Sequence, residues 1–160
     1  MAIQKLVVVH GGELAKDVAE QIAAKKQGSI EVTVRSASER PKALVDFGDD
    51  TLVCFVMQTI ENDAPTEEGG SCARFFKRKT HPESLLDGKF KFTVFGVGDS
   101  NLLLDRQTTT AKDCNQVAQE LDARLEALGG TRHFSLGLAD ERNDLVAVEP
   151  WIDGLWDSLK

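Results

Sequence analysis

The sequence has few cysteines, and their arrangement excludes two classes of small protein. Cys54, Cys72 and Cys114 are odd in number and show neither a CxxC motif nor a Cys/His ligand spacing. A disulfide framework and a zinc site are therefore not predicted, and we expect structural thiols. The three histidines are equally scattered, so no catalytic triad and no metal site is indicated.

Basic residues are also scarce. There are 19 lysines and arginines against 26 aspartates and glutamates, which gives a net charge of −7. Nucleic acids and anionic membranes would repel such a surface, so a basic protein partner is favoured instead. Long apolar runs are absent as well, and the first run is too short for a signal sequence or a membrane span. We therefore expect a cytoplasmic protein.

The remaining composition is that of an ordinary globular protein, with 41% hydrophobic and 28% charged residues among 160. No internal repeat, low-complexity tract or long linker divides the chain. A chain of this length buries enough surface for one core. We expect a single domain over residues 1–160.

Five segments have the pattern of β-strands. Three are apolar at successive positions, as in strands that are buried on both faces: Leu6–Val9, Leu52–Met57 and Phe92–Phe95. Two weaker segments alternate β-branched or aromatic residues with polar ones: Ile30–Val34 and Arg132–Leu136. The pattern predicts a five-stranded parallel sheet.

Helical periodicity fills the intervals between these strands. One amphipathic stripe runs over Leu14–Ile22, and another runs over Val117–Leu128 and ends at a Gly-Gly pair. A third helix is predicted with Ser71 as its N-cap, and a last one is predicted to begin at Pro150. The alternation predicts an α/β fold, a doubly wound parallel sheet with helices on both faces.

Ligands of such sheets bind outside the carboxyl ends of the strands, at the point where the strand order reverses. The segments that follow the first, third and fourth strands along the chain are His10–Leu14, Gln58–Ser71 and Gly96–Asp113. The last two exceed the usual βα connection of about 2–6 residues, and long loops in a compact domain are commonly functional. The site is expected there.

Two of the three protein classes with this topology fail on the loop residues. A receiver domain needs acidic strand ends for magnesium, but the first and third strands end in Val-His-Gly-Gly and Met-Gln-Thr. A dinucleotide-binding fold needs GxGxxG after its first strand and an acid at the end of its second. Here the first loop lacks that spacing, and the second strand ends in Val-Arg-Ser.

The third class is indicated by an ordered series of motifs in the C-terminal half. They are Phe95–Ser100, Leu121–Gly130, Gly137–Asp140, Val148–Ile152 and Gly154–Trp156. This series resembles the FMN-binding domain of the diflavin reductases and is most similar to the methionine synthase reductase branch of that family. The resemblance extends more weakly over the N-terminal half. It implies a flavodoxin-like fold, FMN as the cofactor and a role in electron transfer.

The resemblance also implies a set of cofactor-binding residues and no catalytic side chain. They are Gly11, Gly12 and Leu14 near the phosphate; Gln58, Thr59 and Asn62 along the ribityl chain and ring edge; and Gly98, Asp99, Asn101 and Leu102 at the ring. The loops depart from the family pattern, however. Glu13 places a negative charge where the phosphate is expected, and no tyrosine is present to stack on the flavin. Aliphatic packing of the ring is expected instead.

These departures leave an alternative, a flavodoxin-like domain that has lost FMN and acts as a protein-binding or regulatory module. The sequence shows no FAD- or nicotinamide-binding half. If FMN is bound, a reductase domain is therefore expected to supply the electrons. A basic redox partner is expected to meet acids near the site. These acids are Glu61, Asp63, Glu67, Glu68, Asp140 and Glu141.

Overall fold

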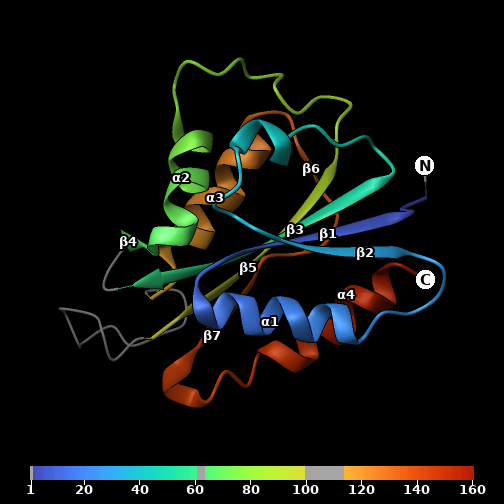
Figure 1. The fold of residues 1–160 in the computed structure, drawn as a ribbon, viewed down its shortest axis with the longest axis vertical. Helices are drawn as coiled ribbons and strands as arrows, with labels where there is room; N and C mark the ends of the chain where they lie inside the picture. The colour runs from blue at the N-terminus through green and yellow to red at the C-terminus, as the bar shows by residue number, and fades with distance from the viewer. Residues whose placement is uncertain (1, 61–63, 100–113) are drawn as a thin grey trace.

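Strands and helices alternate along the chain in the computed structural model, which describes residues 2–60, 64–99 and 114–160. The long strands are β1 (Lys5–Gly11), β2 (Glu31–Ser36), β3 (Thr51–Ile60) and β5 (Lys91–Gly98). They lie in the order β2-β1-β3-β5 and pair in parallel throughout (Figure 1). The predicted parallel sheet is confirmed.

The fifth strand differs from the prediction of one continuous segment at residues 132–136. Two short strands, β6 (Thr131–Arg132) and β7 (Gly137–Asp140), both pair in parallel with β5. Between them the Thr93 hydroxyl donates a 3.0 Å hydrogen bond to the Phe134 carbonyl oxygen. This side chain bonds to the segment between β6 and β7, where the strand pairing with β5 is interrupted. The predicted strand pattern therefore ran across a break in the pairing.

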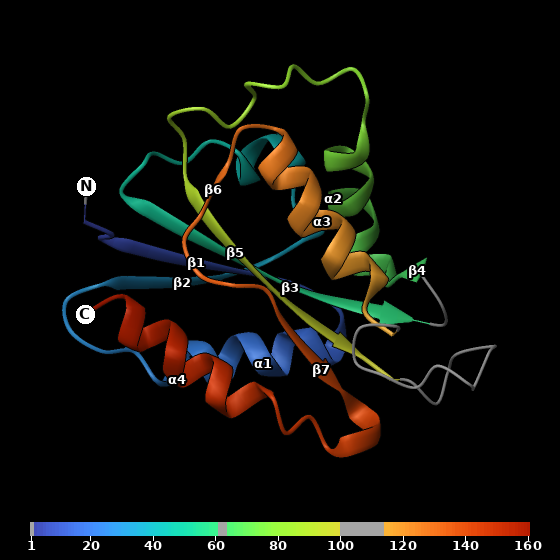
Figure 2. The same cartoon turned by 180° about the vertical axis from the view of Figure 1, so that it is seen from behind.

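Within the described residues, four α-helices cover the sheet, two on each face. They are α1 (Glu13–Ala24), α2 (Glu67–Lys77), α3 (Gln116–Ala127) and α4 (Val148–Ser158). Figure 1 and the reverse view in Figure 2 show α1 and α4 on one face, with α2 and α3 on the other. Helices on both faces were predicted, and the prediction is confirmed.

Two helix starts differ from their predicted positions. The N-cap of α2 is Thr66 and not Ser71, because the Thr66 hydroxyl accepts a 3.1 Å hydrogen bond from the Gly69 N–H group. Gly69 and Gly70 lie inside the helix, although glycine pairs normally indicate a break. Helix α4 begins at Val148, and Pro150 occupies its first turn, where a missing N–H group is tolerated.

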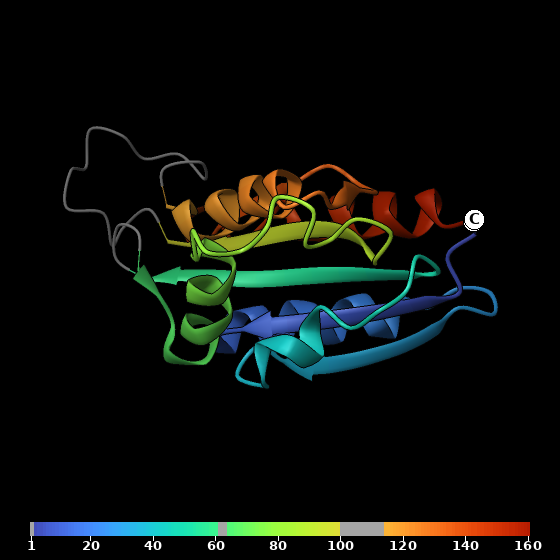
Figure 3. The same ribbon diagram turned by 90° about the horizontal axis from the view of Figure 1, so that it is seen from above.

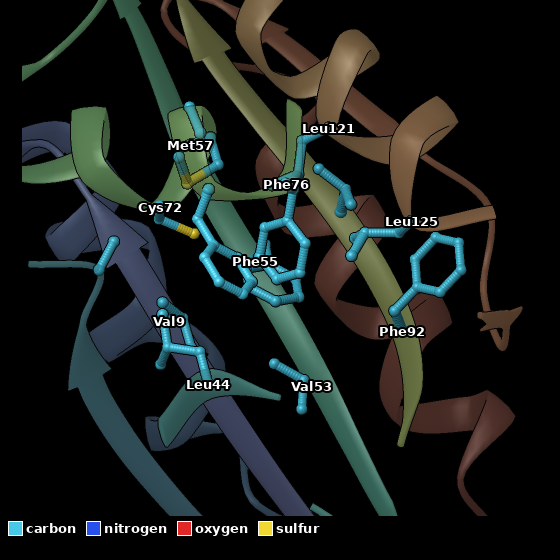
Figure 4. Packing of buried hydrophobic residues seen from close by; sticks show 14 of the residues in the cluster. Val9, Leu44, Val53, Phe55, Met57, Cys72, Phe76, Phe92, Leu121 and Leu125 are labelled. Atoms are coloured by element: carbon cyan, nitrogen blue, oxygen red, sulfur yellow. The ribbon is translucent and has the colours of Figure 1, made fainter. Parts of the chain in front are cut away.

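The core has two halves because alternate residues of each strand face opposite sides of the sheet. In the half between the sheet and α2 and α3, Phe55 packs edge-on against Phe76, with ring centroids 5.8 Å apart (Figure 4). In the other half, the Trp156 indole N–H donates to the Ile22 carbonyl oxygen at 3.0 Å and joins α4 to α1. These contacts hold α2 against the sheet and α4 against α1.

All three cysteines are buried, as expected of structural thiols. Cys72 lies in the core half shown in Figure 4, and burial raises the pKa of its thiol to about 12. It is therefore a neutral, apolar side chain near pH 7. Among the described residues, none of the helices has both the length and the apolarity needed to span a bilayer.

Candidate functional site

The carboxyl ends of the central strands lie side by side at one edge of the sheet. Gly11 of β1 is in register with Met57 of β3, and the next residue, Gln58, is in register with Val97 of β5. Figure 3 shows β1 and β3 pointing the same way, with α2 beside their tips. The strand order reverses between β1 and β3, which is the place where this class of sheet binds its ligand.

The first segment at this edge is a tight turn from β1 into α1. Gly12 is the N-cap of α1, with φ 135° and ψ 160°, a backbone conformation that residues other than glycine rarely adopt. A Cβ atom at Gly12 would also collide with the Gln58 side chain. Glycine at this position lets β3 approach the N-terminus of α1 closely.

Two backbone N–H groups of this turn are bonded to side-chain oxygens from distant segments. The Gly12 N–H group donates to Glu68 Oε1 at 2.8 Å, and the Leu14 N–H group donates to Gln58 Oε1 at 3.0 Å. The first N–H groups of a helix have no partner within the helix, and the helix dipole makes this end attractive to anions. The turn therefore has the donors that an oxyanion requires.

Glu68 is bonded at both of its carboxylate oxygens. Besides Gly12, Oε1 lies 3.2 Å from His10 Nδ1, and Oε2 accepts a 2.7 Å hydrogen bond from the Ser36 hydroxyl. The carboxylate thus connects the carboxyl ends of β1 and β2 to the first turn of α2. About 31% of the side chain is exposed, so one side remains open to solvent.

Close packing of two glycines brings α2 near enough for this contact. A Cβ atom on Gly11 would lie only 2.8 Å from the Gly69 Cα atom, so the two backbones meet without side chains between them. Glu68 immediately precedes Gly69, and its carboxylate then reaches the turn. The Gly69-Gly70 pair that obscured the start of α2 in the sequence is what allows its approach.

The pKa of Glu68 reflects these surroundings. Partial desolvation raises it, but the Gly12 N–H group, the Ser36 hydroxyl and His10 all stabilise the charged form, and the net pKa lies below the usual value for glutamate. Glu68 is therefore an anion near pH 7. An anionic oxygen thus already occupies the N-terminus of α1.

An open hollow of about 760 Å³ adjoins the turn. It is lined by Gly12, Glu13, Lys16, Ser38, Gln58, Thr66, Glu67 and Glu68. Lys16 is the cation in this lining, one turn into α1, and three carboxylates share the lining with it. Another hollow, of about 700 Å³, borders α1 and α4, but none of the β1, β3 and β5 ends contributes to it.

The structure brings together four of the residues expected to bind the cofactor, namely Gly11, Gly12, Leu14 and Gln58. Thr59 is buried, and its hydroxyl accepts a 3.2 Å hydrogen bond from the Val117 N–H group at the start of α3. The segment expected as a long loop from Gln58 is shorter, because β3 continues to Ile60 and β4 (Ala64–Pro65) folds back antiparallel to it.

The ring-side residues lie only partly within the described chain. Gly98 ends β5, and a Cβ atom there would collide with the Cys114 carbonyl oxygen; the half-buried Asp99 follows. Three other expected site residues lie outside the described residues, namely Asn62, Asn101 and Leu102.

The sequence had not indicated the contacts of His10, Ser36 and Glu68 with one another. His10 and Ser36 are register partners at the ends of neighbouring strands, so their proximity was a readable consequence of the parallel pairing. Glu68 was expected among the acids that face a partner. The sequence holds no signal that its carboxylate reaches the β1–α1 turn. Glu13 was expected to oppose the phosphate, but Glu68 accepts from the Gly12 N–H group.

Apart from Glu68, the acids expected near the site differ in their surroundings. Glu67 and Glu141 are exposed at the carboxyl edge, in the first turn of α2 and directly after β7. Asp140 does not project toward a partner, because it is 3% exposed and accepts a 3.0 Å hydrogen bond from the Arg142 N–H group. Glu61 and Asp63 lie outside the described part of the chain.

Comparison with known proteins agrees with this geometry. The flavodoxin family matches residues 12–151. NADPH-dependent diflavin oxidoreductase 1 of Bos taurus is 29% identical over 165 residues, covering 99% of this chain and 26% of the relative. Methionine synthase reductase of Mus musculus is 33% identical over 152 residues, covering 91% of this chain and 20% of the relative.

A further relative is NADPH–cytochrome P450 reductase of Musca domestica, 32% identical over 114 residues, covering 69% of this chain. The chain spans only about a quarter, or less, of the length of these relatives. All three are named as reductases or oxidoreductases, and none supports the alternative of a regulatory module. Since the family match covers most of the chain and the strand order agrees with it, this chain belongs to the flavodoxin family.

Proposed function

We propose that this chain is an FMN-binding electron-transfer domain, formed by residues 1–160 as one unit. The observation that carries the proposal is the pair of N–H groups of Gly12 and Leu14, at the N-terminus of α1 and at the β1/β3 switch point, each already bonded to an oxygen acceptor. This arrangement fits a phosphate group in its donors and its position. The family match supplies the identity of the ligand.

The parts of the cofactor would be held by different segments of the carboxyl edge. Gly12 and Leu14 would donate to the phosphate, with Lys16 as a nearby cation, and Gln58 would adjoin the ribityl chain. Gly98 would lie on the ring side at the end of β5. Roles for Gly11, Thr59, Asp99, Asn62, Asn101 and Leu102 remain part of the same proposal.

FMN, when bound, supplies the one- and two-electron chemistry, so the protein need contribute no catalytic side chain. The chain's own part is to bind and orient the cofactor and to limit its contact with water. The buried strands and the helices on both faces provide a rigid frame for the three connections at the site.

We propose that the electrons come from an NADPH-oxidising reductase domain, because two of the relatives are named NADPH-dependent or NADPH-linked enzymes and are much longer than this chain. That domain is either part of a longer protein or a separate one. The acceptor is proposed to be a basic redox protein, since the chain carries a net charge of −7 and exposes acids at the carboxyl edge.

Binding of FMN to the purified protein tests the proposal directly. A ligand that binds only the folded state at 100 times its Kd stabilises that state by about 2.7 kcal/mol, so saturating FMN should raise the melting temperature clearly. Inorganic phosphate at the same concentration is the control for a non-specific salt effect. Coincident melting curves, with all flavin recovered free after desalting, would instead support a module that has lost FMN.

A further inference from the structure

The Glu68 carboxylate occupies the part of the β1–α1 turn that a phosphate group would need. Its Oε1 atom accepts from the Gly12 N–H group at 2.8 Å, and the His10 ring and the Ser36 hydroxyl hold the rest of the carboxylate in place. Glu68 is therefore held by three partners from β1, β2 and the N-cap of α1. It is not a freely solvated surface acid.

A carboxylate and a phosphate cannot use the same N–H donor together. A carboxylate and a phosphate that compete for one N–H group also repel each other, because solvent screens the charges of a partly buried pair incompletely. Glu13 and Glu67 line the same hollow, and Lys16 offers a single compensating charge within that lining. A phosphate dianion must therefore displace Glu68, whereas a flavin without a phosphate meets no such competition.

We propose that Glu68 is a specificity-determining residue that competes with the phosphate of FMN, so that this chain discriminates little between FMN and riboflavin. The inference rests on the proposed function, since it concerns the same site. It gives a role to an acid of α2, a helix that is distant in sequence from the β1–α1 turn. The partial exposure of the side chain, about 31%, leaves it a path into solvent when it is displaced.

The test is to measure the dissociation constants of FMN and riboflavin, by quenching of flavin fluorescence, for the wild type and for Glu68→Gln. The glutamine keeps the size of the side chain and an oxygen acceptor but removes the charge. We expect FMN to bind at least about tenfold more tightly to the variant, because the like charge is gone, while the riboflavin constant changes by less than about threefold.

Two further variants separate the local effect from a general change in charge. Glu67→Gln removes the same charge from the exposed neighbouring residue, so FMN should gain much less than in Glu68→Gln. Ser36→Ala removes the partner of Glu68 Oε2 and loosens the carboxylate, so FMN should bind more tightly by a smaller factor. This second variant tests the inference without altering Glu68.

The possible results distinguish the inference from the function on which it rests. Tighter binding of FMN alone supports the inference. Equal changes for both flavins, no change, or weaker FMN binding in Glu68→Gln would overturn it and leave the proposed function standing, provided that the wild type binds FMN. If neither flavin binds to any of the proteins at millimolar concentration, the proposed function itself fails, and the inference fails with it.

Discussion

Gly12 is the residue at which backbone conformation and the site are most directly connected. Its dihedral angles belong to a region that is nearly exclusive to glycine, and the Gln58 side chain fills the space where a Cβ atom would lie. The turn therefore depends on glycine for two separate reasons. The same geometry directs the Gly12 N–H group toward Glu68.

We expect Gly12→Ala to lower the free energy of unfolding by about 2–3 kcal/mol, because both strain and a collision follow. The matched control is Gly28→Ala. Gly28 also has a positive φ, 69°, but nothing lies within 4 Å of its hypothetical Cβ atom, so only about 1 kcal/mol should be lost. Urea unfolding of both variants measures the difference, and equal losses would show that Gln58 yields without cost.

Glu68 gives the site a dependence on pH that can be measured without any ligand. Its pKa is below that of an unfolded glutamate, about 4.3, so the unfolded state takes up a proton at a higher pH than the folded state. Its stabilising contribution is therefore complete above the unfolded pKa and is lost as the pH falls through the folded pKa. His10 on β1 is the titratable group in direct contact with it.

Comparison of wild type with Glu68→Gln between about pH 6 and pH 3 isolates this contribution. The difference in unfolding free energy between the two proteins should shrink as the solution is acidified, because the variant has no carboxylate to protonate at this position. Urea titrations at several pH values provide the measurement. A difference that stays constant or grows on acidification would contradict the depressed pKa.

At this scale the sequence revealed backbone requirements better than side-chain partners. Gly11 and Gly12 were expected near the phosphate, and glycines directly after a strand favour a tight turn because glycine adopts backbone conformations that other residues avoid. The contact of Glu68 with Gly12 joins residues 56 positions apart, and it depends on the approach of α2 to β1. Local patterns carry no information on such a contact.

Among the elements, α2 most affects the site, and its N-cap was predicted five residues too late, at Ser71 instead of Thr66. Thr66 caps the helix, so its first turn contains Glu67 and Glu68. The sequence Gly69-Gly70-Ser71 favoured a loop followed by an N-cap serine, but packing against Gly11 overrode that local preference. The divided fifth strand is a similar case, since a tertiary hydrogen bond from Thr93 occupies the interrupted stretch.

Loss of the cap should destabilise the turn that carries Glu68. We expect Thr66→Ala to lower the free energy of unfolding by about 1 kcal/mol, because the Gly69 N–H group loses its acceptor. Thr66→Ser keeps a hydroxyl in the same position and should cost much less. Chemical denaturation of the two variants tests this, and indistinguishable stabilities would mean that solvent replaces the cap.

At the scale of the whole molecule, the sheet could be predicted because its strands are apolar at successive positions. Such runs occur where both faces are covered, and the helical stripes between them then fix a right-handed, doubly wound order. Leu6 and Val8 face the half of the core with α1 and α4, whereas Val7 and Val9 face the other half. The burial of every residue in this run is what makes its pattern recognisable.

Charge is the other property of the whole molecule, and it bears on the proposed acceptor. Exposed Glu67 and Glu141 lie at the carboxyl edge, where the flavin is proposed to bind, while Glu31 and Asp49 lie near the opposite, amino ends of β2 and β3. Reversal of either pair to lysine gives the same net charge. The two double variants therefore differ in the position of the charge and not in its sum.

We expect the FMN-loaded, chemically reduced protein to pass electrons to cytochrome c, a basic haem protein, at a rate that falls as salt is added, because screening weakens the attraction. At low ionic strength, Glu67→Lys with Glu141→Lys should slow the transfer by about tenfold, because steering acts where the two proteins meet. Glu31→Lys with Asp49→Lys should slow it far less. Stopped-flow absorbance of the haem gives both rates. If the two double variants are slowed equally, net charge governs the encounter and the carboxyl edge is not the face that meets the partner.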